Sequence, residues 1–156
     1  MMTTSFKAPV LSGLIAAILA LSAFAAETGL PGIPDEVADL MSQTQLRHFK
    51  LGYAGEVGNW DLAAYESRQI RRTFDKAGAM GGVINGKPLA LWFEEESLPP
   101  LTAIDKAIAE KSTSKFNLAF GTLTKACNAC HRSAKIEFIR LQVPTASPFS
   151  NQAFPP

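Results

Sequence analysis

The only two cysteines of this chain lie in one short stretch with a histidine, Cys127-Asn128-Ala129-Cys130-His131. A C-x-x-C-H spacing is typical of c-type haem attachment. In that chemistry two thiols add across the vinyl groups of the haem, and the histidine that follows gives its imidazole to the iron. The sequence therefore predicts one covalent haem c on Cys127 and Cys130, with His131 as the proximal iron ligand.

Other kinds of site share part of this pattern. A structural zinc site takes four Cys or His ligands, and outside the motif only His48 remains. A thioredoxin-like dithiol starts a helix in a βαβ unit, whereas the residues on both sides of this motif predict helix. A disulfide between Cys127 and Cys130 would close too short a loop to stabilise the chain much. Haem attachment is favoured, and a chance match without haem is the alternative.

The other face of the iron decides the function. A strong sixth ligand gives a low-spin electron carrier, whereas an open position gives a binder of small gases. His48 is the first candidate for the distal ligand, because it is the only other histidine. Met41 is the weaker candidate. It lies seven residues earlier on the same predicted helix, about 10 Å along its axis, so both cannot bind one iron.

Each distal candidate also has an ordinary structural role open to it, and an open or water-filled sixth position is the third possibility. A methionine on an apolar helical stripe usually fills a core, and a lone histidine in a polar stretch usually lies at the surface. We expect a monohaem cytochrome that transfers single electrons to redox partner proteins. The alternative is a five-coordinate haem module that binds NO or CO. An enzyme is not expected, since a peroxidase needs a distal acid–base pair and only His48 with Arg47 resembles one.

The N-terminus has the pattern of a secretory signal peptide. Lys7 precedes an apolar run from Val10 to Leu21, and Ala23-Phe24-Ala25 gives an A-x-A cleavage site. We expect residues 1–25 to be removed, which leaves a soluble periplasmic protein. An uncleaved anchor is the alternative.

Composition bounds the rest of the chain. Its 156 residues carry a net charge of +1, and removal of Lys7 leaves 14 basic and 14 acidic residues. That balance argues against nucleic-acid binding, which needs a basic surface. We expect one domain over residues 26–143 and a Pro-rich, uncharged tail over residues 144–156; a homodimer is possible.

Apolar periodicity predicts an all-α domain of four helices. The first is expected over Asp35–Ala54 and the second, capped by Asn59, over Trp60–Ala77. A connection without strands is expected over residues 78–97. The third helix is expected from Pro99 or Pro100 to Lys111, and the fourth from Ser112 or Ser114 to Leu141. An antiparallel four-helix bundle would hold the motif in its last helix, with the two thiols and the imidazole on one face.

A four-helix bundle with C-x-x-C-H in its last helix resembles the class II cytochromes c, that is, cytochrome c-prime and its low-spin relatives. The chain also resembles a little-characterised group of exported C-N-A-C-H proteins. The stretches that carry this second likeness are Arg47-His48-Phe49-Lys50-Leu51, Ala54-Gly55-Glu56-Val57-Gly58-Asn59-Trp60 and Pro144-Thr145-Ala146-Ser147-Pro148-Phe149-Ser150-Asn151-Gln152. The resemblance implies haem binding but no established reaction. Low-spin class II members take a methionine near the start of the first helix, which favours Met41. The Pro-rich tail departs from the class II pattern.

Overall fold

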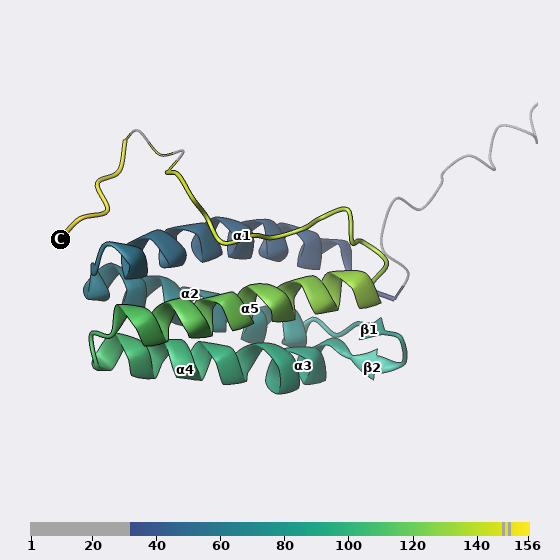
Figure 1. Cartoon of the computed structure of the whole chain (residues 1–156). Helices are drawn as coiled ribbons and strands as arrows, with labels where there is room; N and C mark the ends of the chain where they lie inside the picture. Colours follow the sequence, from purple (N-terminus) through teal and green to yellow (C-terminus); the bar gives the residue numbers. More distant parts are fainter. Residues whose placement is uncertain (1–31, 148, 150) are drawn as a thin grey trace, which may run out of the picture.

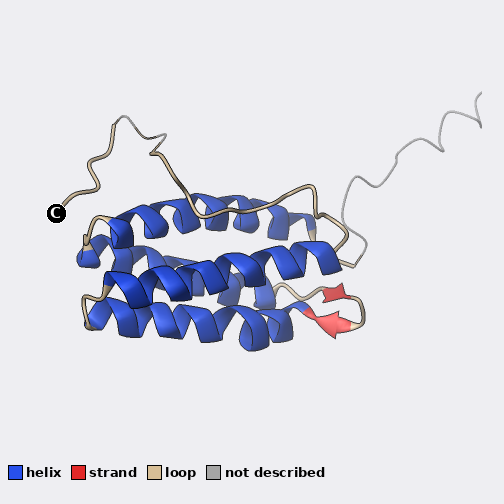
Figure 2. Ribbon diagram, in the orientation of Figure 1, coloured by secondary structure: helices blue, strands red, loops and turns tan. Residues whose placement is uncertain are grey.

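The computed structural model describes residues 32–147, 149 and 151–156, so the predicted signal peptide, residues 1–25, lies outside the described residues. Helices dominate the described part, and the predicted all-α class is confirmed (Figure 1, Figure 2). The elements in chain order are α1 (Asp35–Glu56), α2 (Trp60–Ala79), β1 (Val83–Ile84), β2 (Lys87–Pro88), α3 (Leu89–Trp92), the π-helical turn η1 (Phe93–Ser97), α4 (Leu98–Ala109) and α5 (Thr113–Ser133). Within the same residues, no helix is both long and apolar enough to cross a lipid bilayer.

The first two helices begin and end close to where the sequence predicts. Two acidic residues, Asp35 and Glu36, occupy the first turn of α1, where they interact favourably with the helix dipole. Gly58 makes the turn that follows with a φ of +75°. The Asn59 side chain then accepts a hydrogen bond of 3.1 Å from the N–H of Leu62 and caps α2, as predicted.

The expectation of a strand-free connection over residues 78–97 is wrong. β1 and β2 pair antiparallel, and the turn between them is Asn85-Gly86, with φ of 49° and 78°. Two positive φ values in a row are what a tight two-residue hairpin turn requires. Helix then resumes at Leu89 and reaches Pro99 through the wider turn of η1, so the third helical segment starts ten residues before the predicted proline.

The last helix is shorter than predicted. α5 ends at Ser133, not at Leu141. Lys135 takes a left-handed φ of 60°, and the Ile136 N–H bonds to the His131 carbonyl at 2.9 Å. This is the usual way to end a helix with a residue of positive φ, except that glycine normally fills that position. Because a lysine stands there, the sequence gives no stop signal.

The four long helices lie side by side (Figure 1). α1 packs on α2 and α5, and α4 packs on α2 and α5. α1 and α5 approach closely, because glycines of α1 receive phenylalanine rings of α5. A Cβ atom at Gly52 would lie only 2.7 Å from the Phe120 ring, and one at Gly55 would overlap the Phe116 ring still more. Both rings are almost fully buried, so this contact is part of the core.

After α5 the chain turns back and runs along α1 and α5 (Figure 1). We call residues 134–147 the return segment. Beyond it, the ring of Phe149 lies 5.3 Å from that of Phe49, and the ring of Phe154 lies 5.3 Å from that of Tyr53. The Asn59 amide donates a hydrogen bond of 2.9 Å to the Phe154 carbonyl. The described part of the Pro-rich tail therefore packs on α1.

Candidate haem attachment site

The last turns of α5 carry the C-x-x-C-H motif. Cys127 and Cys130 are one helical turn apart. Both cysteines are partly exposed, and both have free thiols. Both also contact the hydrophobic core, and His131 follows as a half-buried side chain. The motif thus lies in a helix near its C-terminal end, as predicted, and its two cysteines are not paired with each other.

The electrostatic surroundings of the two thiols do not favour a thiolate. Burial raises the pKa of Cys127 to about 12, and the neighbouring Cys130 adds to the rise. Burial raises the pKa of Cys130 to about 11, and the positive charge of Lys87 offsets only part of that effect. A redox-active dithiol needs the opposite, a thiol pKa lowered toward neutrality. These environments weigh against a thioredoxin-like interpretation of the motif.

A zinc site is also not assembled. Among the residues that the structure describes, no group of three or more His, Cys, Asp or Glu side chains comes close enough to hold a metal ion. A structural zinc ion needs four such ligands. Haem iron needs only one or two protein ligands, because the porphyrin supplies the rest.

The imidazole of His131 is oriented by the return segment. Its Nδ1 lies 2.6 Å from the carbonyl oxygen of Ile139. Because a carbonyl only accepts, Nδ1 must carry the proton, and the lone pair of the neutral ring is then on Nε2. Histidines that bind metals are held in this way, with one nitrogen donating to a fixed acceptor and the other free for the metal. The donor set of two thiols and one pre-oriented imidazole fits a c-type haem.

His48 lies in a different environment. It is only 3% exposed, and its Nε2 is 2.9 Å from the Thr124 hydroxyl, which itself donates to the Phe120 carbonyl at 2.9 Å. Because that hydroxyl hydrogen is already used, Nε2 of His48 is the donor to Thr124. Burial lowers the pKa of His48 to about 4, so the ring is neutral at pH 7. The neighbours of His48 in the sequence are mostly polar, but His48 recurs at helical spacing with Leu40 and Leu51, and the structure buries it with them.

Contacts along α1 and α5 define their register. Three pairs of residues meet: His48 with Thr124, Gly52 with Phe120, and Gly55 with Phe116. Positions increase along α1 as they decrease along α5, so these two helices are antiparallel. At equal rise per residue, the residue seven places before His48 is level with the residue seven places after Thr124. Those residues are Met41 and His131. The structure therefore brings Met41 to the level of His131 and leaves His48 about two turns from that level.

Arg47 and His48 do not form one site. Arg47 Nη1 lies 3.2 Å from Glu66 Oε2 on α2, whereas His48 bonds to Thr124 on α5. Glu66 is only 3% exposed, so its charge is held inside the protein by this ion pair. Arg47 thus joins α1 to α2, whereas His48 joins α1 to α5.

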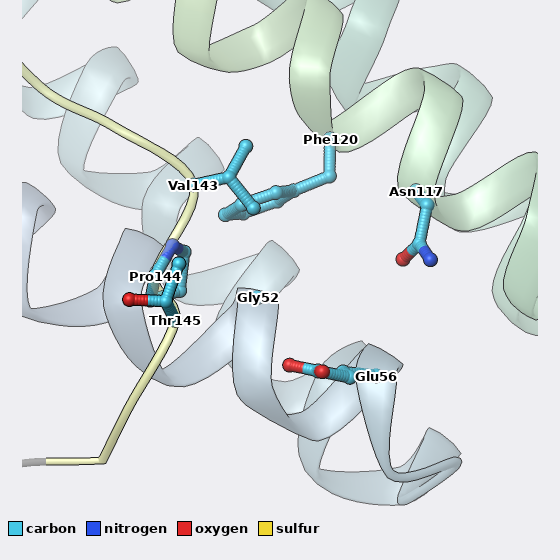
Figure 3. A pocket seen from close by; sticks show the side chains of 7 residues that line it. All are labelled: Gly52, Glu56, Asn117, Phe120, Val143, Pro144 and Thr145. Carbon is cyan, nitrogen blue, oxygen red and sulfur yellow. The ribbon is translucent and has the colours of Figure 1, made fainter.

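Two surface pockets among the described residues border α1, and no residue of the motif lines either of them. The larger, of about 460 Å³, opens between α1, α5 and the return segment (Figure 3). Its lining residues are Gly52, Glu56, Asn117, Phe120, Val143, Pro144 and Thr145. The smaller, of about 270 Å³, lies between α1 and α2 beside Arg47 and Glu66.

Comparisons with known proteins do not identify the chain. No protein-family model, no curated protein and no solved structure matches it. The likeness to class II cytochromes accordingly stays a prediction from the sequence. Three contacts were not expected from the sequence: His48 with Thr124, Asn128 with Leu141, and His131 with the Ile139 carbonyl. Only Asn128, inside the motif itself, gives a signal that could have been followed.

Proposed function

We propose that this protein is an exported, periplasmic c-type cytochrome that carries single electrons on one haem attached to Cys127 and Cys130. The observation that carries the proposal is the hydrogen bond from His131 Nδ1 to the Ile139 carbonyl. It leaves Nε2 available for iron beside two thiols on the same helix. When bound, the haem would supply an iron that cycles between ferric and ferrous states.

The residues of the chain fix the iron environment in this proposal. The Ile139 carbonyl holds the imidazole of His131 in one tautomer and strengthens it as a ligand. Strong donation from the proximal ligand favours the ferric state and so lowers the reduction potential. Apolar side chains around Cys127 limit the access of water to the attachment site. The chain thus supplies the proximal ligand, the orientation of its ring and apolar side chains around the attachment site.

Met41 is the distal ligand that the geometry favours. The register of α1 and α5 places it level with His131, whereas His48 is occupied by Thr124. Met41 is partly buried and packs against the core. A methionine opposite a histidine gives a low-spin iron with a raised potential, suited to electron transfer with protein partners. The packing of the four long helices supports the antiparallel bundle of class II cytochromes as the setting.

A five-coordinate, gas-binding protein is the second candidate. Two observations favour it, because each gives a distal candidate another contact. Met41 contacts the core, and His48 donates to Thr124. If both keep these contacts, the sixth position stays open to NO or CO.

Visible spectra of the purified holoprotein separate the two. For an electron carrier we expect low-spin, six-coordinate ferric and ferrous spectra. Met41→Ala should become high-spin and bind carbon monoxide, whereas His48→Ala should stay low-spin. Met80→Ala is a matched control, because Met80 is 38% exposed and lies after α2. A wild-type ferrous form that is high-spin and binds carbon monoxide would refute the carrier and support the gas binder.

A further inference from the structure

Two side chains of the motif form hydrogen bonds with the return segment. The first contact is the hydrogen bond from His131 to the Ile139 carbonyl, at 2.6 Å. The second is made by Asn128, the residue directly after the first cysteine. Its amide nitrogen donates to the Leu141 carbonyl at 2.9 Å, and its amide oxygen accepts from the Leu141 N–H at 2.8 Å. Both hydrogen-bonding groups of one peptide position are thus held by one side chain.

The two hydrogen bonds between Asn128 and Leu141 attach a stretch that is otherwise mostly exposed. The Leu141 residue is buried, at 9% exposed, whereas the two residues on either side of it, Arg140 and Gln142, are exposed. Phe138, one place before Ile139, is 80% exposed. The stretch therefore has little apolar packing of its own before Leu141, and its position depends on hydrogen bonds. Leu141 lies two residues after Ile139, about 7 Å along an extended chain.

We propose that Asn128 is a positioning residue for His131. By fixing Leu141, it holds the Ile139 carbonyl where it accepts the Nδ1 proton of His131. Through that carbonyl it sets the tautomer and donor strength of the proximal ligand. The inference rests on the proposed function, since it concerns the iron that His131 binds. It gives a residue between the two cysteines a role in tuning the reduction potential.

The test is the reduction potential of the holoprotein, measured by spectroelectrochemical titration. Loss of an outer hydrogen-bond partner of a metal-binding histidine typically lowers metal affinity or activity about 10- to 100-fold, and we take the lower figure for the difference between the two oxidation states. We expect Asn128→Ala to shift the ferric–ferrous equilibrium about tenfold toward the ferrous form, a rise of about 59 mV for a one-electron couple. Asn117→Ala, the same change on an exposed position three turns earlier in α5, should leave the potential unchanged.

A second readout reports the return segment without using the haem. Trypsin cleaves after Arg140, and the fragment that begins at Leu141 can be identified by its mass. We expect this fragment to form faster in Asn128→Ala than in the wild type or in Asn117→Ala. Faster cleavage with an unchanged potential would overturn the proposal, because Asn128 would then only hold the segment.

Leu141→Pro removes one of the two hydrogen bonds from the side of the return segment. Proline lacks the N–H that donates to Asn128, and the change leaves the motif intact. We expect a rise in potential in the same direction, and this variant carries the test if Asn128→Ala does not acquire haem. An unshifted potential in Leu141→Pro contradicts the proposal. A wild-type protein without covalent haem refutes the proposed function, and this inference with it, whereas a loaded protein with unshifted variants refutes the inference alone.

Discussion

At one end of the interface between α1 and α5, Phe116 and Phe120 lie against the glycines of α1 with almost no exposed surface. At the other end, Cys127, Cys130 and His131 are only partly covered. Hydrogen bonds to the return segment, instead of interlocking rings, order the chain there.

The two ends of this helix pair differ in what their contacts do. Ring packing at one end stabilises the fold, and hydrogen bonds at the other end orient side chains. Interlocked rings gain dispersion energy and exclude water, but they leave no group free to react. Backbone acceptors give less stability, but they fix the direction and tautomer of a side chain such as His131. The bond between His48 and Thr124 lies between the two ends.

The largest expected effect is at the sealed end. Gly55→Ala places a Cβ atom in steric clash with the edge of the Phe116 ring, and overpacking of this kind costs about 3 kcal/mol of unfolding free energy. Gly121→Ala is the matched control on α5, because no atom lies within 4 Å of its added Cβ. There the better helix propensity of alanine should stabilise by up to about 1 kcal/mol. Urea unfolding followed by circular dichroism measures both, and equal effects of the two changes would contradict the interlocked interface.

The next largest effect is the pH dependence of stability that comes from His48, which lies between the two ends. The unfolded chain protonates His48 at its ordinary pKa of 6.5, but burial lowers the folded pKa to about 4. Between these values the unfolded state binds more protons, so stability is full above pH 6.5 and falls as the pH falls toward 4. Between pH 7.5 and pH 5 the loss should be about 2 kcal/mol.

A His48→Gln variant is the control for the pH effect. Its amide can still donate to the Thr124 hydroxyl, but it does not titrate. We expect its unfolding free energy to fall by about 2 kcal/mol less than that of the wild type over the same pH range. Parallel pH dependences in the two proteins would mean that His48 is not buried as described.

The smallest effect on stability is expected at the motif end. Asn128→Ala removes two partly buried hydrogen bonds to Leu141, which should lower the unfolding free energy by about 1 kcal/mol. Measured beside Gly55→Ala, it compares the two ends directly. A loss of 3 kcal/mol or more at Asn128 would show that the return segment is part of the stabilising core.

The sequence predicts well what depends on local signals. Apolar periodicity and the Asn59 cap predict α1 and α2, and the motif falls in the last helix as expected. The end of α5 could not be predicted, since Lys135 takes a backbone conformation normally left to glycine. The hairpin was missed although Asn85-Gly86 is a strong turn signal.

The tertiary contacts of the site could not be predicted from the sequence. Scarcity made His48 the first distal candidate, but only the pairing of α1 with α5 shows that Met41 is level with His131. Likewise, nothing in the motif says that a carbonyl eight residues later accepts from His131. Register between helices and contacts to a main-chain carbonyl are set by packing, and they leave no pattern in the sequence around them.

The most direct test of the central claim is the mass of the intact, denatured protein, expressed with its export signal in a host that matures c-type cytochromes. We predict a processed chain that carries one haem. A Cys127→Ala/Cys130→Ala variant should have the mass of the chain alone. A wild-type protein with the unmodified mass of its chain would contradict the account.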